Sequence, residues 1–105
     1  MNIKNLLEFN EVYTFKLNSG EELIAKVLDV DSVQNVVIVS EPVSVAPGPQ
    51  GMGLVPSMFT ADTKLNYKLN ANSISLFAKT EENVKNKYIE AITGITIPDK
   101  KLVLG

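Results

Sequence analysis

The side chains that most often carry out catalysis are scarce in this chain of 105 residues. Cysteine and histidine are absent, which removes thiolate chemistry and the commonest general base and metal ligand. Serines and threonines occur, but without histidine their usual base is missing, and the spacing Ser-x-x-Lys does not occur. Asp29 and Asp31 are alternate residues, and one carboxylate pair does not define an acid–base site. The sequence therefore predicts a protein that is not an enzyme and uses neither a cofactor nor a metal.

The charges also restrict the partners. All ten cations are lysines, no arginine occurs, and the net charge is −2. Arginine is the preferred reader of phosphate and guanine, so strong non-specific binding of nucleic acid is disfavoured and only a small local site is left open. No apolar run approaches the roughly 20 residues of a membrane span. The acidic first residues do not resemble a signal peptide, so we expect a soluble, cytoplasmic protein with no membrane partner.

The periodicity of apolar residues predicts the elements that must position such a site. Residues 2–11 have the i, i+3, i+4 spacing of a short helix. From residue 12 the period changes to two, which predicts a first strand, a turn at Gly20 and a second strand over 22–30. The second strand is apolar on both faces, so it is either covered on both sides or sharply bent in a small barrel. A third strand over 36–39 is expected to continue to Val45, with an edge or a bulge at Pro42.

The second half of the chain begins with a Gly/Pro-rich segment over 46–53, which we expect to be a mobile loop. A fourth strand follows over 54–60 and resumes over 65–69, and a fifth covers 73–78. Thr80 is the expected N-cap of a closing helix over 80–94. This pattern predicts a single domain over 1–98, with a barrel over 12–78 and a tail over 99–105. The fold class is mainly β: an Sm-like or SH3-like small open barrel of five bent antiparallel strands with a helix at each end.

Two motifs narrow the choice of family. Six residues have the spacing of a turn glycine, spaced apolar positions, a small residue, and an Asp and an Asn four apart: Gly20, Leu23, Ala25, Val27, Asp31 and Asn35. A second motif falls at Leu69-Asn70-Ala71 before a short apolar strand. The chain therefore resembles the Sm-like (LSm) family, and in particular the small Sm-like proteins of tailed bacteriophages, including phages of marine bacteria. It departs from the family pattern in having Ala25 for a glycine and Asn70-Ala71 for Arg-Gly.

The resemblance implies a binding site for a base of single-stranded RNA at the loop 31–35. Asp31 and Asn35 would make the polar contacts, Val33 would stand at the stacking position, and Asn70 and Ala71 would replace the Arg-Gly pair. Valine has no π face, so a base would lose stacking of about 1–3 kcal/mol at Val33. The other interpretation is that Asp31 and Asn35 are turn residues that satisfy local backbone donors.

The resemblance also implies a homo-oligomeric ring of about five to eight subunits, in which the fourth strand of one subunit pairs with the fifth of the next. The expected subunit interface consists of Leu65, Tyr67, Leu69, Ile74, Leu76 and Phe77. Such a ring would bind single-stranded RNA around its pore, inside a bacterial host cell if the chain derives from a phage. The alternative is an assembly or protein-interaction ring whose RNA pocket has decayed.

Three other groups of side chains have two interpretations each. Lysines 64, 68 and 79 either flank a surface that binds the nucleic-acid backbone or are solvated strand residues. Tyr13, Phe15, Tyr67 and Phe77 either stack on bases or, as strand alternation favours, form the core. Met52, Met58 and Phe59 either make an adhesive surface for a partner or cover the barrel mouth.

Overall fold

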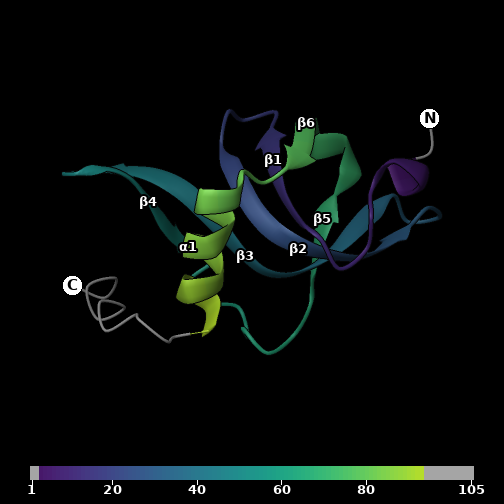
Figure 1. The fold of residues 1–105 in the computed structure, drawn as a ribbon. Helices are drawn as coiled ribbons and strands as arrows, with labels where there is room; N and C mark the ends of the chain where they lie inside the picture. The colour runs from purple at the N-terminus through teal and green to yellow at the C-terminus, as the bar shows by residue number, and fades with distance from the viewer. Residues whose placement is uncertain (1–2, 94–105) are drawn as a thin grey trace.

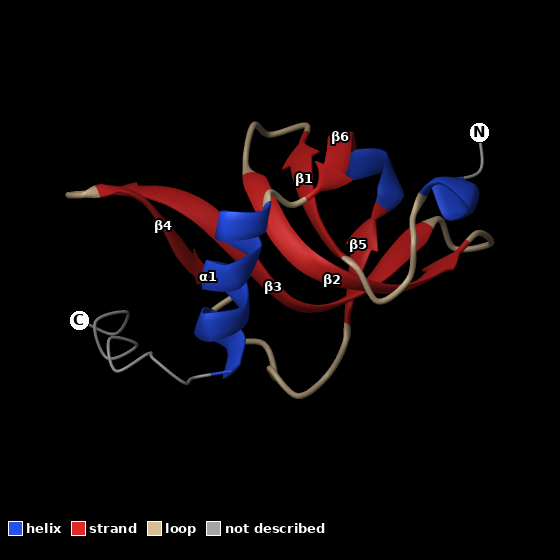
Figure 2. Cartoon of the chain, in the orientation of Figure 1, coloured by secondary structure: helices blue, strands red, loops and turns tan. Residues whose placement is uncertain are grey.

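A computed structural model describes residues 3–93 of the chain (Figure 1). The elements are the 3₁₀ turn η1 (Ile3–Leu6), the strands β1 (Val12–Leu17), β2 (Glu22–Asp31), β3 (Val36–Gly48), β4 (Gly51–Pro56) and β5 (Tyr67–Asn70), the 3₁₀ turn η2 (Ala71–Ser73), the strand β6 (Ile74–Lys79) and the helix α1 (Glu82–Thr93). The predicted mainly β fold with a C-terminal helix is confirmed (Figure 2). The tail predicted over 99–105 lies outside the described residues.

All strand pairs are antiparallel, and the sheet has the order β4-β3-β2-β1-β6, with β5 also paired to β3. The sheet is open and consistent with a small barrel-like fold. Six strands replace the predicted five, because the expected fourth strand is divided. Its two parts, β4 and β5, lie along the same edge of β3 and are separated by the loop 57–66.

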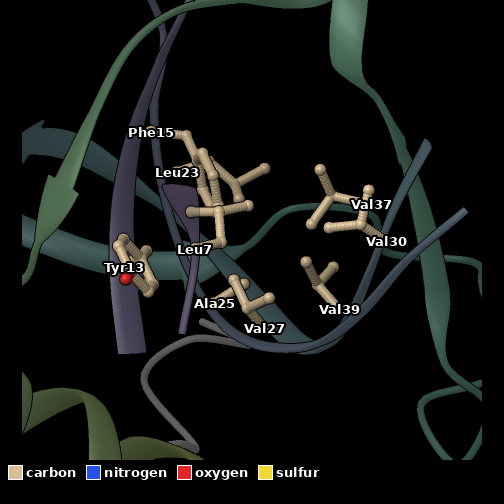
Figure 3. Close-up of a cluster of buried hydrophobic side chains, with 9 residues drawn as sticks. All are labelled: Leu7, Tyr13, Phe15, Leu23, Ala25, Val27, Val30, Val37 and Val39. Carbon is tan, nitrogen blue, oxygen red and sulfur yellow. The ribbon is translucent and has the colours of Figure 1, made fainter. Parts of the chain in front are cut away.

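The second strand is covered on both faces, as its apolar pattern indicated. Leu23, Ala25 and Val27 point into the main cluster of buried side chains, whereas Ile24 belongs to a second cluster on the other face (Figure 3). Val30 also joins the main cluster, because the β2–β3 register shifts between Val27 and Asp29 and so reverses the alternation.

The helix α1 covers the second face of the sheet. Tyr88, which is fully buried, packs with Val12, Ile24 and Val43, and its hydroxyl donates to the carbonyl oxygens of Ser40 and Glu41 at 3.2 and 2.9 Å. Burial raises the pKa of this phenol. The helix therefore fastens onto β3 at one position through both apolar and polar contacts.

The N-terminal helix predicted over 2–11 is wrong within the described residues. Only the 3₁₀ turn η1 forms, and Asn10 reverses the chain with a φ of 70°. The backbone then pairs with β2, where Asn10 N–H donates to Val27 O at 2.6 Å and Val27 N–H donates to Glu11 O at 2.9 Å. Leu7 is buried in the main cluster. A ten-residue helix is marginal by itself, and here the backbone bonds to β2 replace it.

The predicted loop over 46–53 is also wrong, because most of it is strand. β3 continues to Gly48, the chain turns at residues 49–50, and β4 begins at Gly51, which has a φ of 108°. The predicted bulge at Pro42 is confirmed: the β2–β3 register shifts there, and Glu41 has a φ of 52°. We call residues 45–54 the arm, and Figure 1 shows it extending away from the rest of the sheet.

The start of α1 differs from the prediction in one residue. The carboxylate of Glu81 accepts a hydrogen bond from Val84 N–H at 3.1 Å, and the Glu81 carbonyl accepts one from Lys85 N–H at 2.8 Å. Glu81 therefore caps the helix. Thr80 is not the N-cap, since its hydroxyl lies 2.9 Å from that of Thr14 and fastens the chain to β1 instead.

Candidate functional site

The predicted RNA-binding residues lie where the β2–β3 turn meets η2, the short connection from β5 to β6. Val36 pairs with Asn70 in the sheet, which aligns the two segments. Ala71 N–H donates to Asn35 O at 3.0 Å, and the Asn35 side-chain amide donates to Asn72 Oδ1 at 2.9 Å. The structure thus brings Asn35 together with residues 70–72, and the resemblance had implied that Asn70 and Ala71 lie beside Asn35.

The turn between β1 and β2 reaches the same place from the other side. Asn18 N–H donates to Ser73 O at 2.7 Å, and the Asn18 amide donates to Asn72 O at 2.8 Å. Asn18 also accepts from the hydroxyl of Ser75 at 2.5 Å. Asn72 therefore binds two turns at once, Asn18 through its carbonyl and Asn35 through its side chain. We call this meeting of three turns the asparagine junction.

Asp31 has the local role that its turn position suggested. Its Oδ1 atom accepts from the backbone N–H groups of Val33 and Gln34, both at 3.0 Å. Such bonds to the following residues stabilise a turn without any ligand. Asn35 has a φ of 58°, a left-handed conformation that asparagine tolerates better than most residues. Both residues therefore have structural functions.

The remaining predicted site residues differ in accessibility. Val33 is 96% exposed at the tip of its turn, so the stacking position is open to solvent. Asn70 is also exposed, but its side-chain oxygen accepts from Asn72 N–H at 2.9 Å and caps η2. Ala71 is partly buried. The surface that a base would meet is formed by one aliphatic side chain and by amides bonded to one another.

The three lysines proposed to flank this surface do not gather around it. Lys79 lies at the end of β6 away from η2, and its Nζ atom is 3.0 Å from Glu8 Oε1. The hydrogen bond to Glu8 raises the pKa of Lys79. Lys64 is exposed in the loop 57–66, and only Lys68, on β5, is near the junction in the chain. Of these three lysines, therefore, only one can add positive charge near the junction to attract phosphate.

The aromatic residues belong to the core. Tyr13 and Phe15 are buried, and both lie close to Phe77, with ring centroids 6.3 and 6.4 Å away. Tyr67 packs against the same cluster and is only partly buried. This burial favours the core interpretation of the four aromatic residues over base stacking.

The predicted subunit interface separates into inward and outward residues. Tyr67, Leu69, Ile74 and Phe77 are partly buried and pack against the main cluster. Two others point outward: Leu65 is 62% exposed and Leu76 is 68% exposed.

A shift in the β1–β6 register next to Lys16 and Leu17 explains the division on β6. The shift lets Ile74 and Phe77 face inward, although they are three residues apart. Each of β5 and β6 pairs with one strand among the described residues, so each has one edge without a strand partner.

Sequence reasoning missed Asn18, Asn72 and Ser75, which hold the asparagine junction together. The signal available was the clustering of asparagine and serine at residues 70–75 and in the turn 18–19. These residues were interpreted as ordinary turn formers, because the sequence does not show that the two turns meet.

Other kinds of site find little support in the described part of the chain. Residues 3–93 contain no group of three or more acidic, histidine or cysteine side chains that could hold a metal ion. In the same residues, no helix has the length and apolar character to cross a membrane.

Comparisons with known proteins do not identify a family. No family model matches the chain, and no curated protein is similar to it. The class is therefore defined by the fold: a small, mainly β domain with an open antiparallel sheet and one covering helix.

Proposed function

We propose that this chain is a non-catalytic, Sm-like module that assembles with copies of itself into a ring. The observation that supports the proposal is the pair of unpartnered edges on β5 and β6, next to the exposed side chains of Leu65 and Leu76. Soluble proteins rarely leave such edges bare, because free N–H and C=O groups next to apolar side chains promote association.

The two edges are different, so the contact between copies is heterologous: β5 of one copy pairs with β6 of the next. A heterologous contact closes into a ring when the rotation per subunit fits, and rings of about five to eight subunits are expected for an Sm-like chain. In the ring, Leu76 is covered by the neighbouring subunit. Tyr67, Leu69, Ile74 and Phe77 serve mainly to shape the strands, since they pack into their own barrel.

Light scattering on the purified chain at tens of micromolar tests the ring. We expect a mass of several subunits for the wild type and a much smaller mass for Leu76→Asp, which would place an unpaired carboxylate in the contact. Val33→Asp is the matched control, because Val33 is also an exposed apolar residue but lies on the asparagine junction. A monomeric wild type contradicts the proposal, as does an equal loss of mass in both variants.

A second candidate function is binding of single-stranded RNA at the asparagine junction, inside a bacterial host cell if the chain derives from a phage. The observation that favours it is the contact of Asn35 with residues 71–72 beside the exposed Val33. The local hydrogen bonds of Asp31 and the lack of arginine oppose it. They favour the alternative in which the ring serves assembly or protein interaction.

Titration of U-rich and A-rich oligonucleotides at several salt concentrations separates these alternatives. RNA binding predicts micromolar or tighter affinity near physiological salt, with a loss for Asn35→Ala. It also predicts a gain for Val33→Tyr, because an aromatic ring restores stacking of about 1–3 kcal/mol per base. Val33→Thr is the control for the change at that position. If neither Asn35→Ala nor Val33→Tyr alters the affinity, the junction does not bind RNA.

A further inference from the structure

The chain contains one long uncharged stretch. Residues 42–61 include no Asp, Glu or Lys, although the whole chain has ten lysines and twelve acidic residues. The arm lies within this stretch, and so does the beginning of the loop 57–66, where Met58 and Phe59 are exposed. Charged side chains on edge strands are a common protection against unwanted pairing, and the arm lacks them.

The arm is a two-stranded ribbon. The β2–β3 pairing ends at Leu23 and Ser44, so from Val45 onward β3 has only β4 beside it. On the other side of the ribbon, β4 pairs with no described strand except β3. An isolated two-stranded hairpin is marginally stable in water, which makes further strand pairing favourable.

The apolar face of the arm continues beyond the helix that covers its base. Val45 and Leu54 are cross-strand partners and pack against the second buried cluster beneath α1. The next pair on the same face is Pro47 and Met52, and both are exposed, Met52 to 68%. One face of the ribbon therefore passes from a buried contact into solvent without becoming polar.

We propose that β4 of one chain pairs antiparallel with β4 of a second copy of this chain, about a two-fold axis. The arms of two copies then form a continuous four-stranded ribbon. A strand paired with itself in this way presents the same residues on both sides, so the contact is self-complementary and closed. Two copies that each have a net charge of −2 can approach along this neutral stretch without placing like charges opposite each other.

The arm contact is separate from the β5–β6 contact of the proposed ring. Both β4 and β5 lie along one edge of β3, but the loop 57–66 stands between them, so one chain can make both contacts at once. We place the two-fold axis of the arm contact perpendicular to the ring axis, so that chains making both contacts form a particle of two rings with twice the mass of one ring. Chains that make only the arm contact form dimers.

Mass measurement by light scattering on full-length variants tests the proposal. Met52→Lys places a charge on the arm, and we expect it to halve the wild-type mass. Met58→Lys is the matched control, because it adds the same charge to an exposed methionine outside the arm, and we expect the mass to stay unchanged. Leu76→Asp, which acts on the other contact, is expected to leave a particle of two chains, and the double variant Met52→Lys/Leu76→Asp a monomer.

The outcomes distinguish the two contacts. If Met52→Lys has the same mass as the wild type, the arm pairing between copies is wrong. The arm would then bind a partner of different sequence. Equal effects of Met52→Lys and Met58→Lys overturn the arm pairing as well. A third outcome is a dimeric wild type that Met52→Lys converts to monomers and whose mass Leu76→Asp does not change. This outcome supports the arm pairing and contradicts the ring.

Circular dichroism checks that Met52→Lys is folded. If this variant is not folded, hydrogen exchange of the wild type tests the arm pairing instead. The pairing predicts that the β4 amides exchange faster when the protein is diluted. Exchange rates that do not depend on protein concentration overturn the proposal.

Discussion

β3 passes through two environments along its 13 residues. At residues 36–39 it lies between β2 and β5, and Val37 and Val39 are fully buried in the main cluster. At residues 45–48 it has β4 as its only neighbour, and exposure increases toward Gly48. Both halves are uncharged, but residues 36–39 are valine and isoleucine and residues 45–48 read Val-Ala-Pro-Gly. Their burial therefore differs both because the barrel half has a strand on each side and because the arm half has smaller side chains.

The boundary between the halves has a definite structure. Glu41 has a φ of 52° at the bulge, and the Tyr88 hydroxyl donates to the carbonyls of Ser40 and Glu41. A positive φ is unfavourable for a residue with a side chain, so contacts around it must hold the conformation. We infer that the helix fixes the bulge, and that the bulge separates the barrel half of β3 from the arm half.

The largest effect is expected from a charge in the barrel half. Val37→Asp buries an unpaired carboxylate in the main cluster, which should destabilise by about 4 kcal/mol or more and bring a domain of this size close to unfolding. Denaturant titration measures the change. The same substitution in the arm half, Met52→Asp, should leave the monomer folded, and equal losses from the two would contradict the comparison.

Two glycines with positive φ allow the same comparison at the turns. Gly20 lies in the β1–β2 turn of the barrel and Gly51 at the arm turn, and neither has a heavy atom within 4 Å of an added Cβ. Valine at either position is therefore penalised by the backbone alone. We expect Gly20→Val to lower the free energy of unfolding by about 1–3 kcal/mol and Gly51→Val to loosen only the arm. The melting midpoint of Gly20→Val tests the first expectation, and hydrogen exchange of the arm amides in Gly51→Val tests the second.

Removal of the hydroxyl at the boundary should have a moderate effect. Tyr88→Phe leaves two partly buried carbonyls without this donor, and we expect a loss of about 1–2 kcal/mol. Because burial raises the pKa of the folded phenol above its ordinary value of 10.0, this phenol stabilises the fold fully below pH 10. Its contribution is lost as the pH rises further. Stability measured from pH 8 to 11 should therefore decline less in Tyr88→Phe than in the wild type.

The smallest effect is expected at the exposed arm residue. Met52→Ala should change the stability of the monomer by less than about 0.5 kcal/mol, because the side chain is 68% exposed. Thermal melting at low protein concentration checks this value. A loss as large as that of a buried residue would mean that the arm is part of the monomer core.

Much of the barrel could be predicted because its signals are local. The alternation at Tyr13 and Phe15, the two apolar faces of residues 22–30 and the turn at Gly20 all specify strands by themselves. The bulge near Pro42 was predictable for the same reason, since proline cannot donate to the ladder. For the candidate site, the spacing of Asp31 and Asn35 indicated the turn between β2 and β3.

The tertiary structure decided what depends on strands or turns far apart in the chain. Proline and glycine at residues 46–53 indicate a loop, yet pairing between β3 and β4 makes them a hairpin arm. Asn18, Asn35 and Asn72 look alike as turn residues, and only the pairing of strands far apart in the chain brings them together. Local sequence specifies the backbone preference of each segment. Where that preference is weak, the free energy of hydrogen bonds between distant segments outweighs it. Such bonds determined the arm and the asparagine junction.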